Sequence, residues 1–147
     1  MDVRPSLRLR QVVNYVNLST PLGLLAAVLG RARVVAGPGG LVLATGYRLP
    51  VPAAPAFTVG NVVLLRADLD VLRRRPRLLR HEARHATQYA VCVGPVMIPL
   101  YLVAAGWSWL RCRDFAWHNV FERLAGLADG GYADPTTTTQ RPRRQVA

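Results

Sequence analysis

Residues 78–93, LLRHEARHATQYAVCV, form the most informative stretch of this chain. Their pattern predicts a helix that begins near Leu78 and ends where Gly94-Pro95 follows. On that helix His81 and His85 lie one turn apart on the same face, so both imidazoles could hold one ion. Glu82 lies beside them, within reach of a water on that ion. The stretch therefore predicts both the central helix and the site.

The residues His81, Glu82 and His85 make the pattern H-E-x-x-H, in which two histidines bind zinc and the glutamate acts as a general base. These residue types are scarce elsewhere, because the chain has three histidines in 147 residues and Glu82 is one of only two glutamates. A chance match is therefore a poor explanation. We expect Zn²⁺ on His81 and His85, with Glu82 as the catalytic residue.

A third ligand is needed, because catalytic zinc usually has three protein ligands and an open position for water. The downstream candidates are His118, Glu122 and Asp129, which one helix starting near Asn119 would align on a single stripe. We favour Glu122, because a carboxylate facing a dication is strongly stabilised. Two alternatives stay open: His118 is the ligand, or Glu122 folds back to the Asn119 amide in a capping box.

Two further helices are predicted near the N-terminus. The mixed apolar and polar segment 8–18 predicts the first. Thr20 and Pro21 fit the N-cap and first position of the second, and Gly30 fits its C-cap.

Strands are predicted in the segment that follows. Segments 33–36 and 41–45 flank Gly37-Pro38-Gly39-Gly40 and predict a β-hairpin. Three prolines exclude regular structure from 48 to 56, and the β-branched segment 57–66 predicts one more strand.

Residues 86–110 carry no charge, and most of them are apolar. Glycine and prolines interrupt the segment, and the helix that remains, 99–110, would be about 18 Å long against a bilayer core of about 30 Å. We expect a buried core helix and no full membrane span. The alternative is an interfacial helix, anchored by Trp107 and Trp109 beside Arg111 and Arg113.

The chain carries a formal charge of +11, and all nineteen basic residues are arginine. The arginine clusters predict solvated surfaces, or else a surface for anionic lipid. Nucleic acid is disfavoured as a partner, because no aromatic residues interleave the arginines of segment 73–80. The two cysteines lack the spacing of a zinc site or disulfide framework, and no secretion signal is apparent. We expect a cytoplasmic protein, with peripheral contact to the membrane surface as the alternative. The clusters are Arg73, Arg74, Arg75, Arg77 and Arg80, then Arg141, Arg143 and Arg144.

A longer string of residues extends the motif and carries a resemblance. It consists of His81-Glu82-x-x-His85-x-x-Gln88-Tyr89, Gly94-Pro95, Tyr101-Leu102 and Asn119-x-Phe121-Glu122-x-x-Ala125. The string resembles gluzincin-type metallopeptidases, and in particular the small uncharacterised zincin-like domains of bacteria. The resemblance covers about residues 78–132, and its first five residues are far more specific than the rest.

The resemblance implies that His81, His85 and Glu122 are zinc ligands and that Glu82 is the catalytic base. One position departs from the family pattern. Typical gluzincins place an aspartate four residues after the ligand glutamate, where it supports a histidine ligand, and here that position is Gly126. Asp129 could substitute from one turn further on.

The resemblance also implies a fold. We expect an α+β, zincin-like domain over residues 1–132, with a β-hairpin and one further strand packed on the motif helix. A C-terminal helix would carry the third ligand, and residues 133–147 would form a disordered basic tail. The strand at 57–66 would bind a peptide substrate by main-chain pairing.

The expected function is that of a zinc-dependent metallopeptidase acting on a peptide or protein substrate. His118, Tyr132 or Arg84 would stabilise the developing negative charge, and Gln88 would hydrogen-bond to a ligand or to substrate. The alternative is a non-catalytic, zinc-stabilised interaction module with a basic surface that contacts a membrane.

Overall fold

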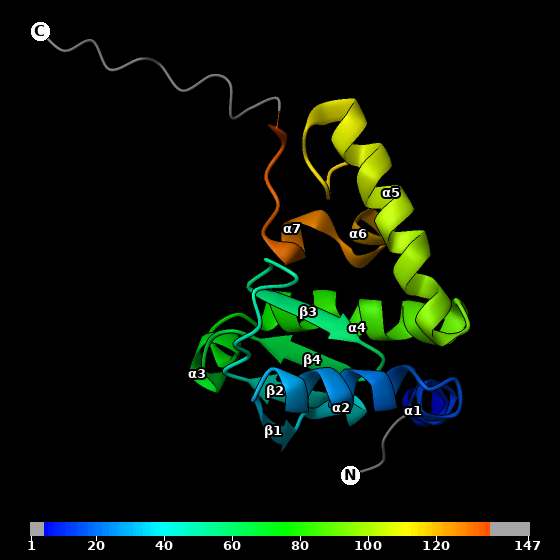
Figure 1. Cartoon of the computed structure of the whole chain (residues 1–147), viewed down its shortest axis with the longest axis vertical. Helices are drawn as coiled ribbons and strands as arrows, with labels where there is room; N and C mark the ends of the chain where they lie inside the picture. Colours follow the sequence, from blue (N-terminus) through cyan, green and yellow to red (C-terminus); the bar gives the residue numbers. More distant parts are fainter. Residues whose placement is uncertain (1–4, 136–147) are drawn as a thin grey trace, which may run out of the picture.

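The computed structural model of the chain describes residues 5–135 and has an α+β architecture (Figure 1). The predicted tail lies mostly outside the described residues, at 136–147. The elements are α1 (Pro5–Val16), α2 (Ser19–Leu29), β1 (Arg33–Ala36), η1 (Pro38–Gly40), β2 (Val42–Thr45), β3 (Ala56–Val59), β4 (Val62–Leu65), α3 (Leu69–Arg73), α4 (Pro76–Val91), η2 (Gly94–Val96), α5 (Met97–Cys112), α6 (Val120–Ala125) and α7 (Leu127–Gly130).

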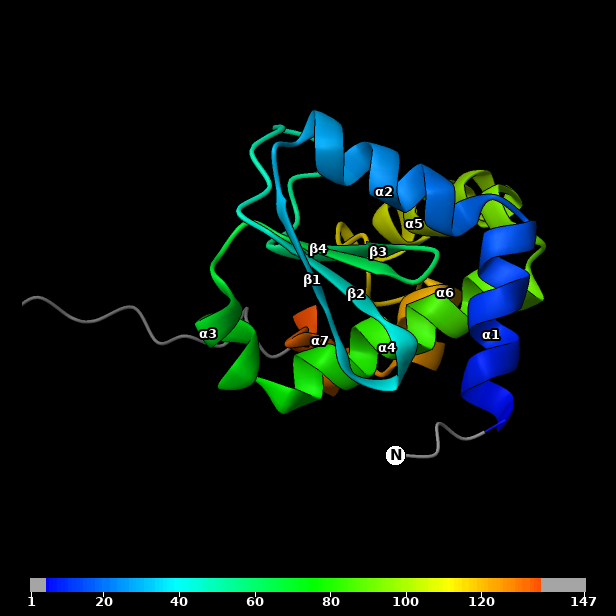
Figure 2. The ribbon, with the colours of Figure 1, turned by 90° about the horizontal axis from the view of Figure 1, so that it is seen from below.

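The four strands form one mixed sheet in the order β1-β2-β4-β3, with α2 and α4 on opposite faces (Figure 2). β2 and β4 are parallel, and the outer pairs are antiparallel. All four residues of β4 are buried, as expected for a strand covered on both faces. Its alternate side chains supply two cores, with Val63 and Leu65 on the α4 side and Val62 and Leu64 on the α2 side.

The β-hairpin is confirmed, because β1 and β2 pair antiparallel across the predicted glycine-rich turn. The single strand predicted over 57–66 is wrong. The chain turns at Gly60-Asn61 and makes two antiparallel strands, β3 and β4. Gly60 has φ +62°, and a Cβ there would lie 2.4 Å from the Thr20 backbone nitrogen, so this turn requires glycine. The consequence is that β3 becomes an edge strand beside α4.

Both N-terminal helices are present, but Thr20 is not an N-cap. Leu18 occupies the N-cap position of α2 in a left-handed conformation. The Thr20 hydroxyl instead accepts a hydrogen bond from the backbone amide of Asn61 at 3.1 Å. It therefore links α2 to the β3–β4 turn, a contact that local sequence does not encode.

The buried core helix predicted over 99–110 is also wrong. α5 begins at Met97, so Pro99 lies in its first turn, where a missing amide proton leaves no helical bond unmade. Only Met97, Ala105 and Ser108 are buried, and most of its apolar side chains face outward. Within residues 5–135 no single helix has the length and apolar character to cross a membrane; α1 with α2 and α4 with α5 pass only as pairs bent by 71° and 113°.

Candidate metal centre

The buried face of α4 carries the motif residues. Pro76 occupies the first turn, and the interior of the helix has only one β-branched residue, Thr87, so the segment favours a helix. His81, Glu82 and His85 are all buried, and α4 packs against β3, α6 and α7. The sheet and the two short helices therefore enclose the motif.

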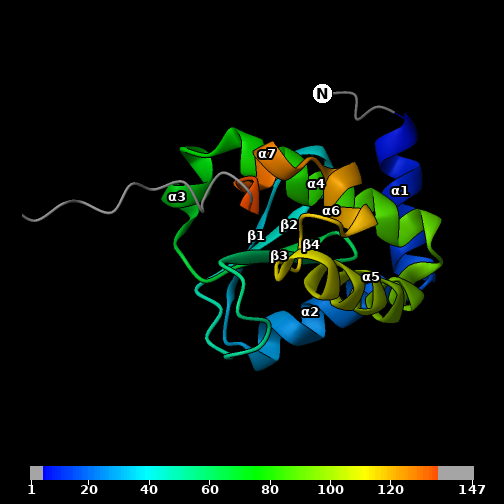
Figure 3. The ribbon, with the colours of Figure 1, turned by 90° about the horizontal axis from the view of Figure 1, so that it is seen from above.

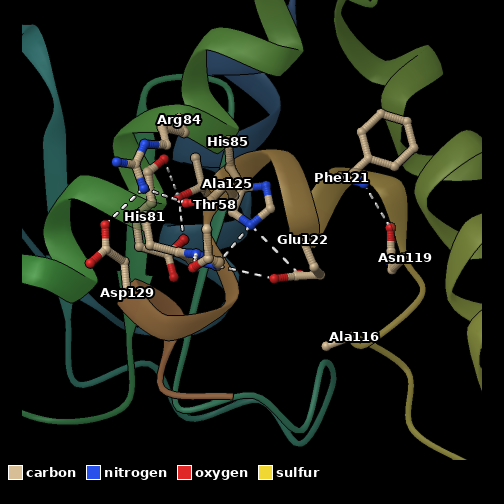
Figure 4. A network of polar contacts seen from close by, with 12 residues as sticks. Thr58, His81, Arg84, His85, Ala116, Asn119, Phe121, Glu122, Ala125 and Asp129 are labelled. Carbon is tan, nitrogen blue, oxygen red and sulfur yellow. Dashed lines mark hydrogen bonds and ion pairs between the residues drawn. The ribbon is translucent and has the colours of Figure 1, made fainter. Parts of the chain in front are cut away.

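Glu122 reaches the same place from α6. Asn119 caps this helix, with its side-chain oxygen accepting a hydrogen bond from the Phe121 amide at 3.0 Å. The backbone amide of Asn119 donates a hydrogen bond to the Ala116 carbonyl, so Glu122 does not fold back onto that amide in a capping box. Its carboxylate instead faces the imidazoles, with Oε2 3.1 Å from His81 Nε2 and Oε1 3.6 Å from His85 Nε2 (Figure 4).

The hydrogen bonds of the outer imidazole nitrogens fix both histidine tautomers. His81 Nδ1 faces the Gly126 carbonyl oxygen at 3.1 Å, and a carbonyl can only accept, so this Nδ1 carries a proton. His85 Nδ1 faces Gln88 Oε1 at 2.8 Å, which is also an acceptor. In the neutral imidazoles, both Nε2 atoms therefore carry lone pairs.

Those two lone pairs point into one small space. His81 Nε2 and His85 Nε2 lie 3.1 Å apart, and the Glu122 carboxylate lies against both. Glu122 Oε2 is buried and accepts no hydrogen bond among the described residues. Three electron-rich atoms that close would repel one another, so a positive charge between them, from a proton or a metal ion, would be stabilised.

A metal ion fits this donor set. One donor atom from each of His81, His85 and Glu122 lies within 4.8 Å of the others, and all three residues are buried. Tetrahedral zinc with bonds of about 2.0–2.1 Å separates its ligand atoms by about 3.3 Å. The two Nε2 atoms lie 3.1 Å apart, and the Glu122 carboxylate approaches His81 through Oε2 at 3.1 Å and His85 through Oε1 at 3.6 Å. The group could therefore hold a metal ion.

The pKa values of His81 and Glu122 are shifted in opposite directions, and each shift favours the charged form. Burial lowers the pKa of His81, but a protonated His81 would donate a hydrogen bond to Glu122 and be attracted by the charges of Glu82 and Glu122; these effects outweigh burial, and the net pKa is raised. Burial raises the pKa of Glu122, but the facing imidazoles of His81 and His85 and the hydrogen bond from Tyr101 hold that pKa well below its usual range. The carboxylate is therefore kept ionised.

Gly126 stands where the gluzincin pattern has an aspartate, and its backbone carbonyl takes the hydrogen bond from His81. Asp129 is outside the group of clustered donors, and it pairs with Arg84 at 2.8 Å. Arg84 also donates to the Ala125 carbonyl at 2.6 Å, so it holds the turn that presents Gly126. The bonds of Arg84 to Asp129 and Ala125 are drawn in Figure 4.

The one helical stripe predicted for His118, Glu122 and Asp129 is not formed. α6 ends at Ala125, its C-cap Gly126 has φ +92°, and Asp129 belongs to α7. His118 precedes α6 and is not part of the metal-binding group; its backbone amide donates to Ser108 Oγ at 2.8 Å. Among the described residues, the cluster thus contains Glu122 and not His118.

Gln88 supports the site through both ends of its amide. Oε1 accepts from His85, and Nε2 donates to the Phe121 carbonyl at 2.9 Å, so one side chain joins α4 to α6. We expect Gln88→Leu to weaken zinc binding by about 10- to 100-fold, because His85 loses the partner that fixes its orientation. Competition with a chromophoric chelator would measure this. Thr87→Ala, one position away on the exposed side, should leave the affinity unchanged, and equal affinity of both variants would contradict the role.

Glu82 lies next to the cluster and is 3% exposed. Thr58 on β3 donates to its Oε2 at 2.7 Å, which orients the carboxylate. Burial raises the pKa of Glu82, against the opposing effects of His85 and the Thr58 hydroxyl. Sequence reasoning missed Thr58, although it is the one hydroxyl in the apolar strand β3.

Two tyrosines complete the surroundings. The Tyr101 hydroxyl donates to Glu122 Oε1, and Tyr132 packs with its ring centroid 6.0 Å from that of His81. Burial, followed by the charge of Glu122, raises the pKa of both phenols, so both stay protonated donors. The role of Tyr101 was missed, and the available signal was a lone hydroxyl in the segment 99–106.

The site opens into a cavity of about 380 Å³. Its walls come from the loop before β3, from β3, α4, α5 and α6, and from Tyr132. Most of the lining is apolar, with Phe57, Met97, Ile98 and Leu102 beside the polar cluster. A cavity of this kind, mostly apolar with a few convergent polar groups, is typical of a binding site.

Comparison with known proteins adds no relative: no family model, no curated protein and no solved structure matches this chain.

Proposed function

We propose that this chain is a zinc-dependent hydrolase that cleaves peptide bonds, built as a small zincin-like domain. The observation that carries the proposal is the convergence of two imidazole Nε2 atoms and one buried carboxylate at 3.1–3.6 Å. A second acid, Glu82, lines the same cavity. Two histidines, a carboxylate and a separate base are the groups that metal-assisted hydrolysis uses.

His81, His85 and Glu122 would hold the metal. When bound, zinc supplies a Lewis acid that polarises a carbonyl oxygen and lowers the pKa of water. Glu82 would accept a proton from the attacking water and deliver it to the departing amine. The Thr58 hydroxyl would orient Glu82, and Tyr132 would donate a hydrogen bond to the developing negative charge.

The substrate would lie along β3. This strand is at the edge of the sheet, pairs with β4 on one side only, and lines the cavity through Ala56, Phe57, Thr58 and Val59. An extended peptide could pair with its free edge and place a carbonyl near the cluster. The apolar cavity wall would receive a neighbouring side chain.

The proposal is tested with zinc-loaded wild-type protein and a library of quenched fluorescent peptides. We expect cleavage that a zinc chelator abolishes and added zinc restores. Full zinc occupancy without cleavage of any peptide, or of an unfolded protein, would contradict the enzymatic function. That outcome would favour the non-catalytic zinc-stabilised module.

A further inference from the structure

α5 rises from the end of α4 along one edge of the molecule (Figure 1) and is seen beside α6 from above (Figure 3). Its packed side carries Met97, Ala105 and Ser108. The opposite side exposes large apolar side chains, with Val103 74% and Leu110 72% exposed. The exposed set is Leu100, Leu102, Val103, Trp107, Trp109 and Leu110, called here the α5 face.

The polarity of α5 is inverted relative to a helix on a water-exposed surface. Between Met97 and Leu110 the two hydroxyl side chains point inward, with Tyr101 bonded to Glu122 and Ser108 bonded to the Asp114 carbonyl. The outward side of this stretch carries apolar residues. A surface helix in water normally has the reverse arrangement, so the α5 face is built for a non-aqueous environment.

Charge and aromatic side chains at the end of α5 indicate which environment this is. Arg111 lies over the Trp107 ring at 5.4 Å, and Arg113 lies over the Trp109 ring at 4.1 Å. No acidic residue occurs from 83 to 113. Tryptophans paired with arginines next to an apolar face match the headgroup level of an anionic bilayer.

We propose that the α5 face binds the surface of an anionic phospholipid bilayer, with α5 lying in the plane of the interface. Arg111 and Arg113 contact lipid phosphates, and the apolar side chains enter the acyl boundary. The α5 face offers few hydrogen-bonding groups, whereas protein interfaces carry about one hydrogen bond per 100–200 Å². Lipid therefore suits this face better than a second protein does.

The proposal is independent of the hydrolase chemistry, but it has a consequence for where the cavity lies relative to the bilayer. Ile98, Tyr101 and Leu102 of α5 line the cavity beside the candidate metal centre. A bilayer on the α5 face would therefore lie next to that cavity.

The test is co-sedimentation of the full chain with vesicles. One set contains phosphatidylcholine alone, and the other contains an equal mixture of phosphatidylglycerol and phosphatidylcholine. We expect wild type to bind the anionic set far more strongly. The double variant V103E L110E should lower that binding by at least about tenfold, because both new charges would have to enter the interface.

A matched control separates the α5 face from overall charge. V12E V28E makes the same change in net charge at exposed positions of α1 and α2, where the wild-type side chains are 59% and 70% exposed. It should retain binding within about twofold. Equal loss in both variants, or no binding of wild type to anionic vesicles, would overturn the proposal. So would a wild-type dimer that V103E L110E dissociates while neither protein binds vesicles, because a second copy would then cover the face.

Discussion

Replacing Glu82 by glutamine is expected to lower turnover by about 10²- to 10⁴-fold, the usual contribution of a general base. The amide keeps the size of the side chain and can still accept the Thr58 hydroxyl hydrogen bond. It cannot take a proton from water. Initial rates of peptide cleavage, measured at equal zinc content, give the comparison.

Two controls make this result specific to the base. Zinc content and thermal midpoint of Glu82→Gln should match wild type, because Glu82 is not one of the three clustered donors. Asp68→Asn makes the same chemical change at an exposed position outside the cavity lining and should keep full activity. If Glu82→Gln retained more than about half of the wild-type rate, Glu82 would not be the base.

Zinc is expected to raise the thermal midpoint of the wild-type protein by about 8–16 °C. Free zinc at about 1,000 times its dissociation constant adds about 4 kcal/mol to the free energy of unfolding. For a chain of about 150 residues, each kcal/mol shifts the midpoint by about 2–4 °C. Differential scanning calorimetry with zinc and then with excess chelator would measure the rise and its reversal.

Two variants identify the third ligand in the same experiment. Glu122→Gln should abolish most of the zinc-dependent rise, because it removes the buried carboxylate 3.1 Å from His81 Nε2. His118→Gln should keep the full rise, because His118 lies outside the cluster. The opposite pattern would transfer the ligand role to His118.

The sequence predicted the parts of the site that one helix determines. The four-residue spacing of His81 and His85 sets their common face on α4, whatever the tertiary structure. Glu122 was selected for its chemistry, and only the packing of α6 against α4 brings it to the imidazoles.

The supporting contacts could not be predicted in the same way. The bond to His81 comes from the Gly126 backbone carbonyl, and every residue has such a carbonyl, so no residue type signals it. In the sequence, Gly126 stands where typical gluzincins have an aspartate that supports a histidine ligand, so the sequence alone indicates a lost supporting contact. The hydrogen bond of Tyr101 to Glu122 depends on how α5 is placed beside α6.

The errors in the fold have similar physical causes. The segment 57–66 is rich in β-branched residues, and the turn within it is placed by Gly60 and its approach to Thr20. Apolar composition alone could not separate a buried α5 from an exposed one, because burial depends on what packs against the helix. The outward direction of Val103 and Leu110 is visible only in the folded chain.

The most direct test is the metal content of the purified wild-type protein, followed by X-ray absorption at the zinc edge. The account predicts about one zinc per chain, bound by two imidazole nitrogens and carboxylate oxygen at about 2.0–2.2 Å. His85→Ala should lose that metal. Less than about a tenth of a zinc per chain after incubation with excess zinc would contradict the account, because a catalytic site of this class binds its metal tightly.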